Sequence, residues 1–382
     1  MFKGHGFVRC GMKIGIIDAD LIGRTKHRFP NLVCMKLSAW YKNVGGNVEL
    51  LTKYENLDDF DKVFIAKVFT DTPVPGWVLN LPNVEYNGTG FFYDKATPLP
   101  TEIEHTRPDY HLYDEWLEQK DDGSTDFLFY KNTDIGFTTR GCFRHCPFCV
   151  NKNYNAVTRH SHVDEFITKE SKRIILLDDN VLGCGEWRSI FEELQATGKP
   201  FQFKQGMDER LLTDEKAKVI FASKWYGDYY FAFDHLKDAE LIESKLAIVK
   251  KYTDKWIKFY TLCGFDYAGK YDNDFWVNDI FGLMERIRIL MKWKCSPYVT
   301  RFYKYKESPY SGVIITVARW ANQSSFYKKQ SLMEFAEANG MNSSSARYLH
   351  TFETMFPDIK PYFDMKIGGT GTRKENIIQS LF

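Results

Sequence analysis

"DIGFTTRGCFRHCPFC", from Asp134 to Cys149, is the stretch of sequence that decides the fold. Its first part, Asp134 to Thr139, is typical of a buried strand, and the chain then enters a loop that holds Cys142, Cys146 and Cys149. The spacing is C-x3-C-x2-C. Three thiols this close together, in a chain without a regular pattern of paired cysteines, indicate a metal centre or catalysis.

Strand and helix patterns alternate on the carboxyl-terminal side of this stretch. Helical patterns separate the strand patterns, which predicts a partial, open (β/α)6 barrel over residues 131–310, because six units are too few for a closed eight-stranded barrel. The six predicted strands are Asp134–Thr139, Arg173–Asn180, Phe201–Gly206, Tyr229–Asp234, Trp256–Phe265 and Pro297–Phe302.

Polar residues gather where these predicted strands end. In parallel βα folds the ligand site lies at the carboxyl ends of the strands. The cysteine loop leaves the end of the first strand, so we expect the thiols and these polar residues at one mouth. The polar residues are Asp178, Asp179, Asn180, Gln205, Asp208, Arg210, Asp234, His235, Asp266 and Arg301.

The three thiols leave two metal centres open from the residues alone. A structural zinc site needs four ligands, and His145, His160 or His162 could supply the fourth. A cubane iron–sulfur cluster normally takes four thiolates, so three would leave one iron open to a small molecule. The zinc alternative corresponds to a non-catalytic metal-binding protein, and so does a purely structural iron–sulfur centre.

The cysteine motif, with Phe148 just before its last cysteine, resembles the signature of the radical SAM superfamily over roughly Asp134 to Tyr303. The resemblance implies a [4Fe–4S] cluster whose open iron binds S-adenosylmethionine (SAM). An electron donor such as flavodoxin or ferredoxin would drive cleavage of SAM to a 5′-deoxyadenosyl radical, which abstracts hydrogen from an unidentified substrate. It implies no catalytic side chain beyond the cluster ligands.

The same resemblance suggests which residues contact SAM. Phe148 matches an aromatic position against the adenine, Asp178, Asp179 and Asn180 replace a motif that contacts the methionine amino group, and Gly264 would allow backbone to lie along the adenine. Gln205 and Asp234 are candidates for ribose or methionine contacts. Candidates for the substrate are Asp208, Arg210, Arg301 and Tyr303. An aspartate at a strand end is also a common helix N-cap, and Asp208 and Arg210 could form a local ion pair.

The N-terminal third predicts a separate α/β domain over residues 1–92. Strands at Met12–Asp18, Asn47–Leu51, Lys62–Phe69 and Val84–Phe92, with a helix at Asn31–Asn43, form a βαβ pattern. The stretch resembles the flavodoxin-like, cobalamin-binding domain of many radical SAM enzymes. In that family the first loop reads D-x-H-x-x-G, whereas here "DADLIG" places Asp20 where the histidine would be. Aspartate is a poor ligand for cobalt.

The remaining parts of the chain are simpler. Residues 93–130 are polar and contain prolines, which predicts a linker over the surface. Residues 311–382 have helical patterns and predict a small helical segment, whose end, "MKIGGTGTRKE", is interpreted as a flexible tail rather than a phosphate site. Trp320, Phe326 and Tyr327 are expected to form an aromatic cluster in its core.

Composition limits the partners. The chain has 382 residues, of which 44% are hydrophobic and 16% aromatic, enough for a large core. Lys and Arg total 51 against 50 acidic residues, so the overall charge gives no reason to expect nucleic acid as a partner. No apolar run approaches the ~20 residues that span a bilayer, and Met12 is a candidate start. We therefore expect a cytoplasmic protein with reduced thiols.

Two enzymatic functions compete on these observations. One is a radical SAM enzyme that abstracts hydrogen without cobalamin, and the other is a cobalamin-dependent radical SAM methyltransferase. The absent histidine weakens the second, although a corrinoid held without a protein ligand stays possible. A methylthiotransferase would bring three further cysteines in the N-terminal domain, where only Cys10 and Cys34 occur.

Overall fold

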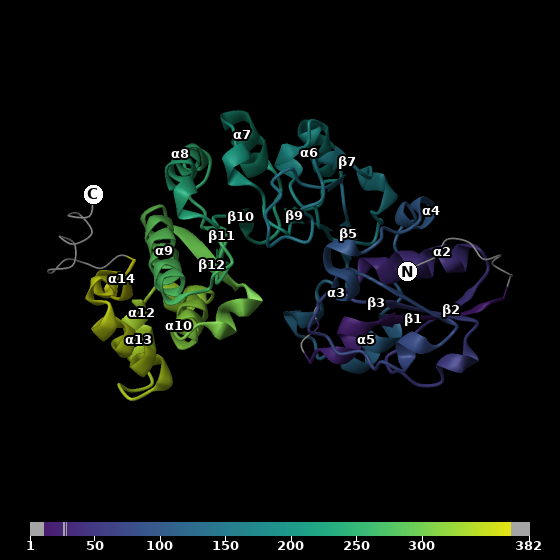
Figure 1. Ribbon diagram of the computed structural model, residues 1–382. Coiled ribbons are helices and arrows are strands. Elements are labelled where there is room, and N and C mark those ends of the chain that lie inside the picture. The colour runs from purple at the N-terminus through teal and green to yellow at the C-terminus, as the bar shows by residue number, and fades with distance from the viewer. Residues whose placement is uncertain (1–10, 26, 28, 368–382) are drawn as a thin grey trace. The chain divides into compact units, whose positions relative to one another are not determined.

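The computed structural model describes residues 11–25, 27 and 29–367 (Figure 1). Contacts divide the chain into two compact units, Met1–Gln205 and Gly206–Phe382. No helix in the described part of the chain is long and apolar enough to cross a membrane. The prediction that the protein starts at Met12 concerns residues 1–11, of which residues 1–10 lie outside this description. The glycine-rich end beyond Ile367 lies wholly outside it.

The first unit begins with a parallel four-stranded sheet. Its strands are β1 (Lys13–Asp18), β2 (Asn47–Leu50), β3 (Lys62–Ala66) and β4 (Val84–Asn87), in the order β2-β1-β3-β4. This order matches the first four strands of the flavodoxin-like arrangement. The predicted strands are confirmed, although β3 and β4 are shorter than expected. The strand β4 ends early because Gly88 turns the chain with φ +121°.

The helices beside this sheet have capped starts and bury apolar residues against it. Asn31 accepts hydrogen bonds from the N–H groups of Val33 and Cys34 at the start of α2 (Leu32–Asn43). Asp18 caps the short α1 (Ala19–Gly23) in the same way. The buried core of this layer includes Ile14, Ile16, Leu37, Tyr41 and Phe64.

Residues 93–130 do more than link two domains. They contain α4 (Thr101–Glu104) and α5 (Asp114–Lys120), and α3 (Thr89–Phe92) lies just before them. Leu99, Ile103, Leu112, Tyr113, Leu117 and Tyr130 are buried in the same core cluster as Ile14 and Phe64. The segment therefore completes the first core instead of wrapping the surface. The predicted domain boundaries themselves stay a prediction.

A second parallel sheet in this unit carries the cysteine loop. Its strands are β5 (Thr133–Gly136), β8 (Arg173–Leu176) and β9 (Phe201–Phe203), in the order β5-β8-β9. A two-stranded antiparallel pair, β6 (Thr139–Arg140) and β7 (Thr158–Arg159), follows β5. The amphipathic α6 (Trp187–Ala196) buries Phe191 against Phe201 and Phe203.

The second unit repeats the strand–helix pattern. Its strands β10 (Tyr229–Ala232), β11 (Ile257–Cys263) and β12 (Cys295–Arg301) form a parallel sheet in that order. The predicted helices are confirmed as α7 (Asp214–Ala222), which precedes β10, and α8 (Ala239–Val249) and α9 (Asn273–Lys292), which lie between the strands. The α/β class with parallel sheets is thus confirmed. The partial barrel stays a prediction, because the six strands occur as two three-stranded sheets in separate units.

The C-terminal segment is helical, as predicted. Ser331 and Ser343 cap α12 and α13, and Trp320 and Tyr327 are fully buried together with Trp276 of α9. Phe326 packs against this core, so the expected aromatic cluster is confirmed. The helices are α10 (Ser311–Ala321), α11 (Ser324–Tyr327), α12 (Leu332–Glu337), α13 (Ser344–Met355) and α14 (Lys360–Asp364).

Candidate functional site

The cysteine loop, residues 141–157, leaves β6 and returns through β7, which pairs with it. Thr139 lies opposite Arg159 and Arg140 lies opposite Thr158. Gly141 begins the loop with φ +90°, and a Cβ there would lie 2.5 Å from the carbonyl oxygen of Ala156. The two ends of the loop lie so close together that only glycine fits this position.

Asp178 anchors the base of the loop. Its carboxylate, which is 2% exposed, accepts hydrogen bonds from the N–H and hydroxyl groups of both Thr138 and Thr139. Burial raises the pKa of Asp178, and these donors oppose that shift. Asp178 therefore fixes the bend between β5 and β6, which gives this predicted cofactor residue a structural role.

Asp179 hydrogen-bonds two segments of the loop. Its Oδ2 accepts from the Gly141 N–H at 3.2 Å and its Oδ1 accepts from the Asn151 amide at 2.5 Å. Burial raises the pKa of Asp179, while the Gly141 N–H and the positive charge of Arg140 lower it. The carboxylate thus ties the first residue of the loop to the segment just after Cys149.

Two of the three thiols receive hydrogen bonds from neighbouring amides. The Asn180 side-chain amide donates to Cys142 Sγ at 3.5 Å, and the Asn151 N–H donates to Cys149 Sγ at 3.4 Å. The Cys149 N–H donates to the Cys146 carbonyl and closes a turn between these cysteines. Burial, followed by the charge of Asp179, raises the pKa of Cys149, although the Asn151 N–H opposes this.

Asn180 also carries an unused acceptor. Its side chain is 2% exposed, and its Oδ1 has no hydrogen-bond partner among the described residues. Buried polar atoms are normally paired, so such an atom needs an explanation. Its amide nitrogen is already committed to Cys142, so this acceptor lies beside the first thiol.

The three histidines considered as a fourth zinc ligand all have hydrogen-bond partners. His145 hydrogen-bonds the Lys152 carbonyl, His160 hydrogen-bonds Glu104, and His162 hydrogen-bonds Glu193. One ring nitrogen of each histidine makes this contact, and a metal-bound histidine commonly makes such a contact through its second nitrogen. Within residues 11–25, 27 and 29–367, no three His, Cys, Asp or Glu side chains form a single-ion site. In a cubane, each thiolate binds a different iron, which suits three separate thiols.

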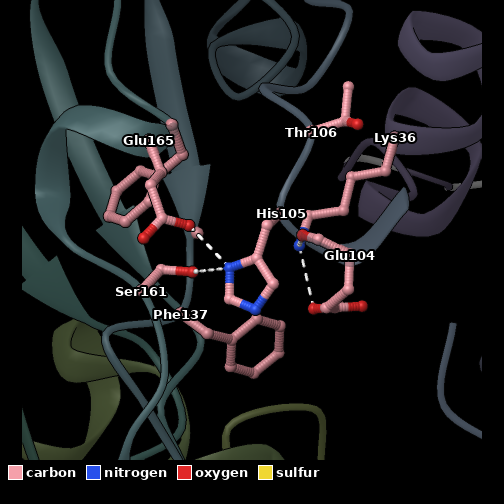
Figure 2. A pocket seen from close by; sticks show the side chains of 9 residues that line it. Lys36, Glu104, His105, Thr106, Phe137, Ser161 and Glu165 are labelled. Carbon is pink, nitrogen blue, oxygen red and sulfur yellow. Dashed lines mark hydrogen bonds and ion pairs between the residues drawn. The ribbon is translucent and has the colours of Figure 1, made fainter. Parts of the chain in front are cut away.

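A polar pocket lies beside the start of the loop and includes Lys36, Glu104, His105, Ser161 and Glu165 (Figure 2). Lys36 Nζ lies 2.8 Å from Glu104 Oε1, and the His105 ring hydrogen-bonds Glu165 at 2.7 Å. Figure 2 shows the His105 ring between the two carboxylates. Sequence reasoning missed Glu104, because its partners are distant in the chain and form no motif.

The candidates in the second unit have local partners. Arg210 pairs with Asp208 at 2.7 Å and with Asp238 at 3.1 Å. Asp234 accepts the Leu262 N–H at 3.0 Å, and Gly264, with φ +80°, donates its N–H to Asp279 at 2.7 Å. These contacts hold the ends of β10 and β11.

The remaining candidates lie at the surface of the described chain. Arg301 and Tyr303 are exposed, with the Arg301 guanidinium 4.7 Å from the centre of the Tyr305 ring. Gln205 is exposed at the end of the first unit. The first unit gathers Asp178, Asp179 and Asn180 at the cysteine loop, whereas a common mouth for all candidates stays a prediction.

The "DADLIG" loop does not offer a ligand to cobalt. Both Asp20 oxygens are occupied, since Oδ2 accepts the Val68 N–H at 2.7 Å and Oδ1 accepts the Thr72 hydroxyl. Asp18 accepts hydrogen bonds from Tyr113 and from the N–H groups that start α1, and it also pairs with His27. Both carboxylates are fully buried. Asp20 holds the loop after β3 and Asp18 holds the start of α1, so neither fits a corrinoid bound through this position.

Comparisons with known proteins point to solved radical SAM enzymes. No family model matches the sequence, and no curated protein matches it. The chain is similar to TsrM of Kitasatospora setae, a radical S-adenosylmethionine methyltransferase solved with cobalamin and a [4Fe–4S] cluster bound. The identity is 10% and the TM-score 0.49, over 76% of this chain and 72% of TsrM.

A second similarity is to OxsB, a cobalamin-dependent S-adenosylmethionine radical enzyme. The structure with aqua-cobalamin bound is 11% identical, with a TM-score of 0.36, over 92% of this chain and 56% of OxsB. The apo structure gives 12% identity and a TM-score of 0.35, over 90% and 61%. The chain thus spans a little over half the length of OxsB. These TM-scores are below 0.5, so the function proposed below rests on the residues of this chain.

Proposed function

We propose that this protein is a radical SAM enzyme in which Cys142, Cys146 and Cys149 hold a [4Fe–4S] cluster with one iron left for SAM. Three thiols on one loop, at the C-x3-C-x2-C spacing, support this donor set. When bound, the cluster and SAM supply a 5′-deoxyadenosyl radical that abstracts hydrogen from the substrate. The protein's own residues bind and orient the cluster and SAM, and they exclude water from the site.

One observation carries the proposal most directly. Asn180 donates to Cys142 Sγ while its Oδ1 is buried and unpaired within the described chain. An acceptor held beside a cluster ligand suits the ammonium group of a methionine that binds the neighbouring open iron. Asn180 would thus pair with both cofactors, and the charge on the ammonium would satisfy the orphan oxygen.

The other residues have supporting parts. Asp178 fixes the bend before the loop and Asp179 ties the two sides of the loop through Asn151, so both position the thiols. Phe148 is proposed to contact the adenine. From the family resemblance we also assign cofactor contacts to Gln205, Asp234 and Gly264, and substrate contacts to Asp208, Arg210, Arg301 and Tyr303.

The proposed fold and partners follow from the same assignment. The two three-stranded parallel sheets are proposed to be the halves of a partial (β/α)6 barrel over residues 131–310. A flavodoxin or ferredoxin is the proposed electron donor, and the site is proposed to work in the cytoplasm. No cobalamin-dependent step is derived, because Asp18 and Asp20 are committed inside the N-terminal domain.

Anaerobic reconstitution tests this proposal. The wild-type chain is expected to take up about four iron and about four sulfide, and SAM is expected to change the spectrum of the reduced protein. Cys146→Ala should abolish the formation of 5′-deoxyadenosine, since it removes one of three thiolates. The control is Cys34→Ala, which alters a buried thiol whose hydrogen bond goes to the Ile17 carbonyl. One zinc without sulfide in the wild type would instead identify a structural metal site.

A further inference from the structure

A short segment of the first unit contacts the cysteine loop at two places. We call residues 93–104 the brace. Just before the loop, Arg140 Nη2 lies 3.0 Å from Glu104 Oε1. Around the last cysteine, the Tyr93 hydroxyl donates to the Phe148 carbonyl at 2.9 Å, and Lys152 pairs with Asp94 at 3.1 Å. Two anchors close together in the sequence thus hold the segments that flank the three thiols.

The anchor at Glu104 is rigid. One carboxylate oxygen, Oε1, receives Lys36 at 2.8 Å, Arg140 at 3.0 Å and His160 at 3.0 Å. The Glu104 side chain is 13% exposed, and Lys36 is itself buried (Figure 2). Burial raises the pKa of Glu104, but His160, Lys36 and Arg140 lower it far more, so the group is a carboxylate. It cannot turn away from Arg140 without losing its other two partners.

The anchor at Tyr93 is held in a strained backbone conformation. Tyr93 has φ 51° and ψ −120°, a combination that glycine adopts and other residues avoid. Strain of this kind costs on the order of 1–3 kcal/mol and persists only where surrounding contacts impose it. The side chain is 37% exposed, so burial of the ring does not account for the strain. The Tyr93 hydroxyl bonded to Phe148 and the Lys152 ammonium 5.8 Å from the centre of the ring are contacts that hold the residue in this conformation.

We propose that Tyr93 and Glu104 are positioning residues that fix the cysteine loop in the shape needed by its three thiols. The inference rests on the proposed function. Asn180 and Asn151 donate to two of the thiols, and Asp179 ties Asn151 to Gly141. The brace adds contacts from a separate segment to Arg140, Phe148 and Lys152. Fixing these positions lowers the conformational entropy that is lost when the thiols are ordered. The segment that follows the N-terminal domain then serves the loop.

The first test removes one hydroxyl. Tyr93→Phe keeps the ring and loses only the hydrogen bond to the Phe148 carbonyl. After anaerobic reconstitution we expect the variant to release iron to a chelator about fivefold faster than the wild type, as the loss of one hydrogen bond allows. The matched control is Tyr54→Phe, because the Tyr54 hydroxyl is buried in the same unit and has no partner within the described residues. Equal rates in Tyr93→Phe and the wild type would overturn the proposal.

The second test separates positioning from stability. Tyr93→Gly relieves the strained backbone and removes the anchor. The unfolding midpoint of the metal-free protein should stay the same or rise, whereas iron release and the electron paramagnetic resonance spectrum of the reduced protein should change. If the midpoint and the metal retention fell together, Tyr93 would be an ordinary packing residue.

The third test addresses the Glu104 anchor from its exposed side. Arg140→Gln breaks the ion pair to the loop and leaves Lys36 paired with Glu104, so folding should persist. We expect iron release to accelerate several-fold. Arg107→Gln is the matched control, since Arg107 donates to the Asp164 carbonyl and not to the cysteine loop. Retention equal to that of the control would refute a role for this anchor.

A measurement without metal distinguishes this inference from the proposed function. If the wild type takes up no iron and sulfide, the proposed function fails. The brace is then judged by the rate at which iodoacetamide alkylates Cys142, Cys146 and Cys149 in the metal-free protein. Faster alkylation in Tyr93→Phe than in Tyr54→Phe would support the brace, and equal rates would overturn it.

Discussion

Buried carboxylates in this protein differ in whether they have hydrogen-bond donors as partners. Asp178 and Glu104 are both largely buried, and each accepts hydrogen bonds from several donors. Glu209 is fully buried, and neither of its carboxylate oxygens has a hydrogen-bond partner among the described residues. The paired groups hold the cysteine loop, whereas nothing in the proposed chemistry uses Glu209. A negative charge on Glu209 is therefore costly to the fold.

The pH dependence of stability tests this cost. Burial, followed by the charge of Asp208, raises the pKa of Glu209 well above its usual value, although Lys245 opposes the shift. A raised carboxyl pKa means that the folded protein binds the proton more tightly, so the penalty grows as pH rises above the unfolded pKa, about 4.3. Glu209→Gln should therefore gain stability relative to the wild type, by at least about 1 kcal/mol more at pH 8 than at pH 5.

Chemical denaturation at the two pH values provides the measurement. Glu240→Gln is the control, because Glu240 lies exposed in the same unit. Its effect should stay within about 0.5 kcal/mol and should not vary with pH. An equal effect of Glu209→Gln at both pH values would show that the carboxyl titrates normally in the fold.

The helices and strands could be predicted from the sequence more fully than the contacts of the candidate site. The strand β11, with alternating buried and partly buried residues, and the capped helices α2 and α13 were predictable from local patterns. The contact between Glu104 and Arg140 was not, because no local pattern relates a short helix to a strand 36 residues away. Likewise, the three cysteines were evident from their spacing, but the Asn151 contact to Cys149 required the folded loop.

The glycine that starts the loop tests how tightly β6 and β7 are joined. Gly141→Ala places a Cβ 2.5 Å from the Ala156 carbonyl oxygen at φ +90°, so one side of the loop must move. We expect a loss of about 1–3 kcal/mol in unfolding free energy and a marked loss of iron after reconstitution. Gly185→Ala is the control, as no described atom lies within 4 Å of its added Cβ. Full iron uptake by Gly141→Ala would mean that the loop tolerates displacement.

At the scale of the whole molecule, the two units contain different parts of the predicted site. Asp178, Asp179 and Asn180 belong to the first unit together with the cysteines, and Asp234 and Gly264 belong to the second. The local structure already explains Asp234 and Gly264 through Leu262 and Asp279. The family resemblance implies that all of them contact SAM, and a ligand-dependent measurement over the whole chain tests that prediction.

Hydrogen exchange with SAM is that measurement. In the reconstituted wild type, SAM should slow exchange in peptides around Asn180 and also in peptides around Gly264, since the family resemblance assigns contacts to both. At 100-fold the dissociation constant, a ligand bound only by the folded protein adds about 2.7 kcal/mol, so local protection should be readily measured. Cys146→Ala, which cannot complete the cluster, should lose both effects. Protection confined to the first unit would leave the cysteine loop as the SAM site but would remove Asp234 and Gly264 from it, together with the main reason for a six-stranded half-barrel.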